Sequence, residues 1–168
     1  SIFLLRTIAK LFEKIPEKFA FTDESKLKSG VLFWISFAFS FICYLPWYLY
    51  SFPGIMDPDT MTQMRQVVGI NPYSNHHPVA HTFLIKIACK IAGIFTNDIN
   101  KQVGFYTFLQ MIFFSFCVAY VVYTLHRFMR VKTWICFVVL AFYSLVSFMN
   151  VHVVFICKDT VFAGFTML

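Results

Sequence analysis

Val31 to Tyr50 read VLFWISFAFSFICYLPWYLY, twenty consecutive residues without a charged side chain. A helix of this length spans about 30 Å, the thickness of the hydrocarbon core of a bilayer. Two further runs, 103–125 and 133–157, also lack Lys, Arg, Asp and Glu. The three runs predict an all-α, polytopic transmembrane protein with three spans in a single transmembrane domain, residues 1–168.

The overall composition agrees with this class. Hydrophobic residues make up 59% of the 168 residues and charged residues only 13%, with a mean hydropathy of +0.70. A soluble domain of this size needs far more polar surface. The formal net charge of +6 comes from basic residues that flank the apolar runs. We therefore expect a lipid bilayer, and no nucleic acid, as the main partner.

Basic residues also set the expected orientation in the membrane. Six of them precede the first span: Arg6, Lys10, Lys14, Lys18, Lys26 and Lys28. An excess of Lys and Arg beside a span marks the cytoplasmic side. The pattern predicts a multi-pass protein of the cell membrane with a cytoplasmic N-terminus and an external segment after the first span.

Residues 78–95 admit two interpretations. They are largely apolar but carry Lys86 and Lys90, and a lysine near the middle of a span costs about 2.5 kcal/mol or more. If the segment were a fourth span, the basic loop from Arg127 to Lys132, between the runs 103–125 and 133–157, would lie outside, against the charge rule. As a helix lying along the membrane, it keeps all of 51–102 external. We favour the second interpretation, which gives two juxtamembrane helices, at about 58–69 and 78–95.

Two acids open the first of these helices. Asp57 precedes Pro58, which is the pattern of an N-cap followed by proline at the first helical position. Asp59 falls in the first turn, where a negative charge suits the helix dipole. Capping alone explains both acids, but a carboxylate held above the bilayer can also bind a divalent cation or accept a proton from a hydroxyl. The apolar face of the helix is predicted to carry Met61, Met64 and Val68.

Three histidines lie between the two predicted helices, in the stretch His76-His-Pro-Val-Ala-His81. His77 and His81 are four residues apart, a spacing that can hold zinc on one helix face. Pro78 would begin that helix and leave His77 at its edge, and no HExxH pattern is present. We therefore favour His76, His77 and His81 as hydrogen-bond donors to a phosphate or a carboxylate, with bonding between loop segments as the alternative.

Lys158 and Asp159 directly follow the third predicted span. A lysine that reaches toward the headgroups beside an acid is ordinary at this position. The functional interpretation pairs Asp159 with Asp59 across a divalent cation, Mg²⁺ or Mn²⁺, and puts Lys158 or Arg65 beside a phosphate. These residues form the candidate site of catalysis, metal binding and substrate binding.

The order of these features resembles the polytopic GT-C glycosyltransferases, and more narrowly a family of uncharacterised bacterial multi-span proteins placed in that superfamily. The resemblance rests on Phe52-Pro-Gly, Asp59-Thr, Gln63, Gly69, Tyr73-Ser-Asn-His-His-Pro-Val-Ala-His-Thr82 and Lys158-Asp159. It covers residues 30–168, and the further spans and the large acceptor-binding portion of the family have no counterpart there. The sequence also starts with Ser and stops in an apolar stretch. We therefore expect a fragment of a longer protein, which by itself could be inactive.

The resemblance implies the transfer of a sugar from a polyprenyl-phosphate donor to an acceptor on the external membrane face. It assigns Asp59 as the catalytic acid and Asp159 as the second acid, with Asp57 as an alternative for the first role. The rival interpretation is a transporter or a non-catalytic membrane subunit, whose polar groups would line a path through the bilayer. The three runs carry no charge near their middle, which favours a site at the surface.

Overall fold

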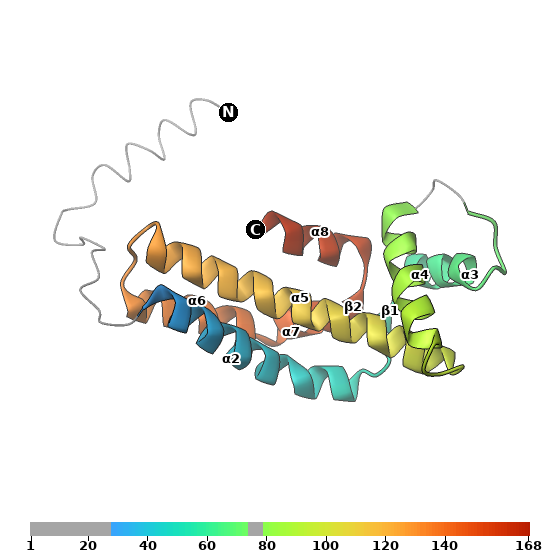
Figure 1. Cartoon of the computed structure of the whole chain (residues 1–168), viewed down its shortest axis with the longest axis horizontal. Helices are drawn as coiled ribbons and strands as arrows, with labels where there is room; N and C mark the ends of the chain where they lie inside the picture. Colours follow the sequence, from blue (N-terminus) through green and yellow to red (C-terminus); the bar gives the residue numbers. More distant parts are fainter. Residues whose placement is uncertain (1–27, 74–78) are drawn as a thin grey trace, which may run out of the picture.

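The computed structural model describes residues 28–73 and 79–168, which form seven α-helices and two short strands. In chain order the elements are α2 (Ser29–Tyr50), β1 (Ile55–Met56), α3 (Pro58–Val67), α4 (Val79–Gly93), α5 (Ile99–Arg127), α6 (Thr133–Leu145), α7 (Ser147–Val154), β2 (Phe155–Ile156) and α8 (Lys158–Thr166). The long helices α2 and α5 run side by side with α6, and α3 and α4 stand at one end of this bundle (Figure 1). The predicted helical class is confirmed, with one small parallel strand pair added to it.

Helices α2 and α5 occupy the first two predicted spans as candidate membrane-spanning helices. They contain 22 and 29 residues, and both are apolar enough to cross a membrane. At 1.5 Å per residue they extend for about 33 and 44 Å. Ser36 and Ser40 of α2 are fully buried, and the Ser40 hydroxyl lies 2.9 Å from that of Ser144 in α6. Small polar residues at such contacts let membrane helices pack closely.

The third predicted span, 133–157, is divided between two helices, and whether α6 and α7 together make one span stays a prediction. Helices α6 and α7 meet at an angle of 58°, as a broken span or a re-entrant loop. The break has no proline or glycine; Val146 is extended, with φ −72° and ψ 117°. Two carbonyl groups beside the break have side-chain partners. The Tyr44 hydroxyl donates to the Tyr143 carbonyl at 3.0 Å, and the amide of Asn150, in its satisfied orientation, donates to the Ser144 carbonyl at 3.1 Å. Backbone at membrane depth needs such partners.

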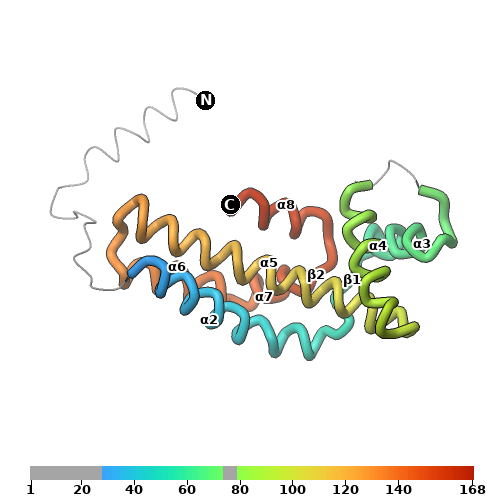
Figure 2. Tube along the Cα trace, in the orientation of Figure 1, coloured from blue at the N-terminus to red at the C-terminus, as the bar shows by residue number. Residues whose placement is uncertain are grey.

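The strand pair decides which ends of the helices meet. β1 follows α2 and β2 follows α7, and the two strands pair in parallel. Figure 2 shows the strands beside each other where the chain leaves these helices. At the other end of the bundle, Ser29 Oγ of α2 lies 2.8 Å from His126 Nδ1 of α5. The helix ends therefore alternate as three successive passes require; which side of the membrane each end faces stays a prediction.

Helices α3 and α4 occupy the two predicted juxtamembrane segments. α3 ends two residues earlier than expected, and Gly69 (φ +82°) continues the turn that follows it. Of the predicted apolar face of α3, Met64 is buried, whereas Met61 and Val68 are 49% and 48% exposed; Gln63 and Gln66 are buried as well. α4 leaves apolar side chains exposed, among them Phe83, Leu84, Ile87 and Ile91. That both helices lie along a membrane surface stays a prediction.

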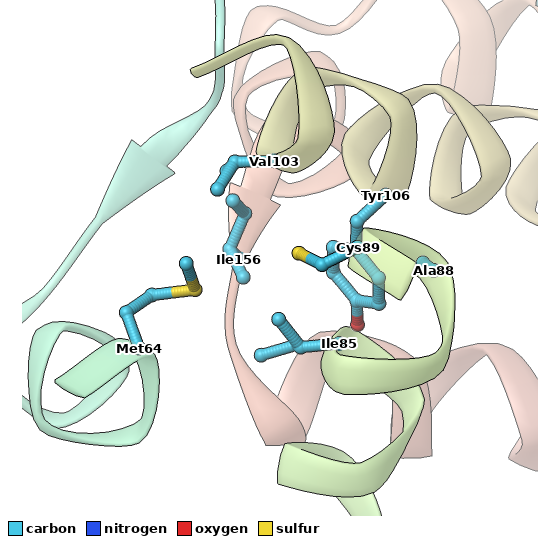
Figure 3. Close-up of a cluster of buried hydrophobic side chains, with 7 residues drawn as sticks. All are labelled: Met64, Ile85, Ala88, Cys89, Val103, Tyr106 and Ile156. Atoms are coloured by element: carbon cyan, nitrogen blue, oxygen red, sulfur yellow. The ribbon is translucent and has the colours of Figure 1, made fainter. Parts of the chain in front are cut away.

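One apolar cluster joins α3 and α4 to the bundle. Its buried members are Met64, Ile85, Ala88, Cys89, Val103, Tyr106 and Ile156. Figure 3 shows these side chains converging from α3, α4, α5 and β2. Burial of the cluster packs α3 against β2, and the helices that follow β1 and β2 carry Asp59 and Asp159 in their first turns.

Candidate functional site

Two similar strand-to-helix units meet at the β1–β2 pair. Each two-residue strand runs directly into the N-terminus of a short helix, α3 after β1 and α8 after β2. Asp59 is the third residue after β1, and Asp159 is the third residue after β2. The strands are parallel and in register, with Met56 opposite Ile156. Both helices therefore begin at the same end of the strand pair, where the two strands finish. Residues a hundred positions apart in the sequence are thereby brought together.

Asp57 has the predicted role of N-cap. Its carboxylate accepts a hydrogen bond from the backbone N–H of Thr60 at 2.6 Å, and Pro58 is the first residue of α3. Burial acts to raise the pKa of Asp57, but the hydrogen bonds from Thr60 and the positive charge of Lys158 outweigh it, so the pKa lies below its ordinary value. Asp57 is therefore ionised at neutral pH and committed to the helix start.

Asp59 and Lys158 form an ion pair across the two units. Lys158 Nζ lies 3.9 Å from Asp59 Oδ2, and the two side chains are 32% and 58% exposed, respectively. An ion pair this open to solvent contributes little to stability. Both groups therefore remain accessible to a substrate, which is what a functional role requires.

Asp159 lies in the first turn of α8, beside Cys157. The Cys157 thiol donates to Asp159 Oδ2 at a donor–acceptor distance of 3.7 Å. Burial raises the pKa of the Cys157 thiol, which keeps the proton on sulfur and available for this contact. The Asp59–Lys158 ion pair brings the start of α8 to the start of α3, while the pairing of Asp59 with Asp159 and the catalytic roles stay predictions.

A cavity of about 450 Å³ opens beside Asp159. Side chains of α2, α5, α6, α7 and α8 line it, and most of them are apolar, for example Phe114, Val118 and Met167. His152 also lines it, with its ring against Phe148 at a centroid distance of 4.4 Å. The bend between α6 and α7 forms one wall. An apolar chain fits such a space, with a polar head at the acidic end.

His81 is part of the interior that supports the site. It is only 4% exposed, with Nδ1 2.8 Å from Gln63 Oε1 and Nε2 3.0 Å from the Tyr106 hydroxyl. An amide oxygen only accepts, which assigns the proton to Nδ1 and makes Nε2 the acceptor of the Tyr106 hydroxyl. Burial lowers the pKa of His81 to about 4. A neutral His81 with both nitrogens engaged joins α3, α4 and α5, a positioning role rather than the predicted contact with a phosphate.

The other predicted phosphate ligands are less constrained. His76 and His77 lie outside the described residues. Arg65 is exposed in the last turn of α3, six residues after Asp59, which corresponds to about 9 Å along the axis and about 120° around it. The structure therefore does not bring Arg65 into the Asp59–Lys158 pair.

The predicted metal site rests on the carboxylates of Asp59 and Asp159. Within residues 28–73 and 79–168, no group of three or more His, Cys, Asp or Glu side chains is arranged to hold a metal ion. Lys158 places a positive charge next to Asp59. Binding of Mg²⁺ or Mn²⁺ by Asp59 and Asp159 stays a prediction.

Sequence reasoning missed two residues that hold the site together. The Thr60 hydroxyl donates to the Ile156 carbonyl and so ties α3 to β2. Gln110 of α5 donates through Nε2 to the carbonyls of Val153 and Phe155, at 2.8 and 2.9 Å. A glutamine inside an apolar run is a usable signal, because polar groups at that depth need partners. Thr60 carries no such signal, since threonine is ordinary near a helix start.

Comparison with known proteins adds no relative. The sequence matches no protein-family model, and neither a curated protein nor a solved structure shows significant similarity to it. The likeness to GT-C enzymes therefore rests on the quoted residues, and functional inference rests on the geometry of the acid site and its cavity.

Proposed function

We propose that this chain carries the catalytic site of a GT-C-like membrane glycosyltransferase, which moves a sugar from a polyprenyl-phosphate donor to an acceptor at the external membrane face. One observation carries the proposal. The β1–β2 pair places Asp59, Lys158 and Asp159 at one edge, next to a largely apolar cavity of about 450 Å³. Such a site can take a substrate whose head is charged and whose tail is hydrocarbon.

The chemistry assigns a role to each charged group. An acceptor hydroxyl attacks the anomeric carbon of the donor, a new C–O bond forms, and the bond from that carbon to the phosphate oxygen breaks with its electron pair. Asp59 takes the hydroxyl proton, as a general base within reach of solvent. Lys158 stabilises the negative charge that grows on the leaving phosphate, where a fixed cation has most effect.

The second acid sits closer to the hydrocarbon. Asp159 borders the cavity, so we assign it to the sugar or, with Asp59, to a divalent cation that bridges to the phosphate. The prenyl chain extends from there into the cavity between α5, α7 and α8. The lipid tail then stays in an apolar environment while the sugar reaches water.

The proposal is tested by transfer assays on the full chain in liposomes, with a panel of radiolabelled polyprenyl-phosphate sugars. Asp59→Asn and Asp159→Asn should each reduce transfer about 100-fold or more. Asp98→Asn is the matched control, because Asp98 is also an acid at a helix start but caps α5. Equal activity of the Asp59 and Asp98 variants would remove Asp59 from the mechanism.

A binding assay tests the site without turnover. Cys157 lines the cavity and is partly exposed, so donor lipid should slow its reaction with a maleimide. Cys43 of α2 is also partly exposed but does not line the cavity, and its labelling should not change. Labelling of Cys157 at the same rate with and without donor contradicts the placement of the donor.

A transporter is the second candidate, and the broken helix α6–α7 favours it. Discontinuous helices commonly surround the substrate site of secondary transporters. Uptake of a radiolabelled polar solute into sealed vesicles, with no chemical change to the solute, would support transport over transfer. If the chain is a non-catalytic subunit, we expect neither sugar transfer nor solute transport.

A further inference from the structure

A second hollow lies at the C-terminal end of α3, whereas Asp59 lies at its N-terminal end. It has a volume of about 280 Å³ and is formed by the end of α3, one side of α4 and the start of α5. The ten residues of α3 separate it from the acids by about 15 Å. Its charged lining groups are Lys86 and Lys90. The described residues that line it include no acid, so an anion meets two positive charges there.

The two lysines are arranged to act together. They are four residues apart on α4 and so project from the same face of the helix. Lys86 Nζ donates to the Tyr73 hydroxyl at 2.6 Å and lies 4.9 Å from the centre of the Tyr73 ring. Tyr73 in turn stacks on Phe83 of α4, with ring centroids 5.8 Å apart. Lys86 is thereby held in place before any ligand binds.

The surroundings indicate what kind of anion fits. The pocket lies at the start of the span α5, where lipid headgroups would lie beside the helix end. On α4, apolar side chains next to the lysines are exposed, including Ile87, Ile91, Ile94 and Phe95 in and just after the helix. The nearby acid Asp98 is engaged with its own helix, where its carboxylate accepts from the Asn100 N–H at 2.9 Å. Charge and apolar surface are thus adjacent, as in a lipid with an anionic head.

We propose that this pocket binds the phosphate group of an anionic membrane lipid, whose acyl chains lie against the exposed apolar side of α4. Lysines near a membrane surface attract anionic lipids, and basic pockets between helices bind their headgroups. The bound lipid fixes α4 along the membrane surface. The site is separate from the acid pair and does not depend on the proposed transfer activity.

The first test measures lipid retention. The full chain is placed in nanodiscs of phosphatidylcholine with or without phosphatidylglycerol, and bound lipids are counted by native mass spectrometry. The variant Lys86→Gln/Lys90→Gln should retain phosphatidylglycerol roughly tenfold less well than the wild type. The matched control Arg127→Gln/Lys132→Gln loses the same charge at the opposite end of the bundle and should retain it normally. Equal losses in both double variants would reduce the effect to general charge attraction and overturn the proposal.

The second test needs no variant and so does not depend on folding of a mutant. Lysine-reactive footprinting of the wild type should show Lys86 and Lys90 protected by phosphatidylglycerol, while Lys101, on α5, reacts at an unchanged rate. Inorganic phosphate added to phosphatidylcholine nanodiscs separates the two sources of the anion. Protection by inorganic phosphate equal to that by the lipid, or no protection by either, contradicts a lipid site.

Discussion

The two strand-to-helix units at the site have the same layout but are held in different ways. α3 has a side-chain cap from Asp57 and buries polar residues, namely Thr60, Gln63 and Gln66. α8 begins at Lys158, and its N-cap residue Cys157 makes no side-chain cap. The helix exposes Phe162 and Phe165, which are 70% and 60% exposed.

This difference shows which unit positions the other. The polar face of α3 reaches both His81 and the carbonyl of Ile156, so α3 is bonded to α4 and to β2. α8 rests mainly on α5, where Gly164 packs against Phe113. We infer that β1 and α3 form the fixed half of the site, and that Lys158 and Asp159 take their place from it.

The largest expected effect on stability comes from adding a side chain where β1 lies close to β2 and α5. Gly54 precedes β1 with φ +141°, and a Cβ there would lie 2.6 Å from Thr107 Oγ1 and 2.8 Å from Ile156 Cδ1. Gly54→Ala should lower the free energy of unfolding by about 2–4 kcal/mol, from backbone strain plus overpacking. Denaturant titration in detergent measures it. Gly30→Ala, with nothing within 4 Å of its Cβ, is the control, and equal behaviour of the two variants would contradict the close approach.

A smaller effect is expected from cutting the bond that ties α3 to β2. Thr60→Val keeps the shape of the side chain but leaves the buried Ile156 carbonyl without its donor. The loss should be about 1–3 kcal/mol, measured by the same titration. Thr62→Val is the control on the same helix, since the exposed Thr62 hydroxyl donates only to the Pro58 carbonyl, at 3.0 Å. If the Thr62 variant loses as much stability as the Thr60 variant, α3 does not position β2.

The smallest effect is expected from pH, which acts on the fixed half through His81. The pKa of His81 is about 4 in the fold, against an ordinary value of 6.5, so the unfolded chain takes up the proton first as pH falls. The contribution of neutral His81 to the free energy of unfolding is complete above pH 6.5. It decreases as the pH falls from 6.5 toward 4. Between pH 7.5 and 5.5 the loss should be about 1 kcal/mol.

Thermal unfolding at the two pH values measures this loss. His81→Gln should remove the dependence, whereas His126→Gln, at the opposite end of the bundle, should retain it. A wild type that is more stable at pH 5.5 than at pH 7.5 would contradict a neutral, buried His81.

The sequence predicted those parts of the fold that depend on local composition. Long runs without charge located α2 and α5, because only a helix satisfies its backbone inside a bilayer. Asp57-Pro58 located the start of α3, because cap and proline act within one turn. Asp59 and Lys158-Asp159 were predicted to lie on the same side of the membrane, and the contact between Lys158 and Asp59 agrees with that prediction.

Contacts between distant residues explain what the sequence did not predict. The bend at Val146 has no proline or glycine to announce it, and its carbonyl partners come partly from Tyr44, about a hundred residues earlier. The two-residue strands are too short for any period-2 pattern. Apart from Met64, the buried face of α3 is polar. Two of its polar side chains have polar partners, His81 and the Ile156 carbonyl, and no property of α3 alone reveals that.

The account rests on both acid loops facing the same side of the membrane. Single cysteines at positions 59, 129 and 159, in a background without the five native cysteines, can be tested on intact cells with a membrane-impermeant thiol reagent. We predict that the cysteines at 59 and 159 react and the one at 129 does not. Reaction at 129, with 159 protected, would contradict the account, because α4 would then span the membrane and the acids would lie on opposite sides.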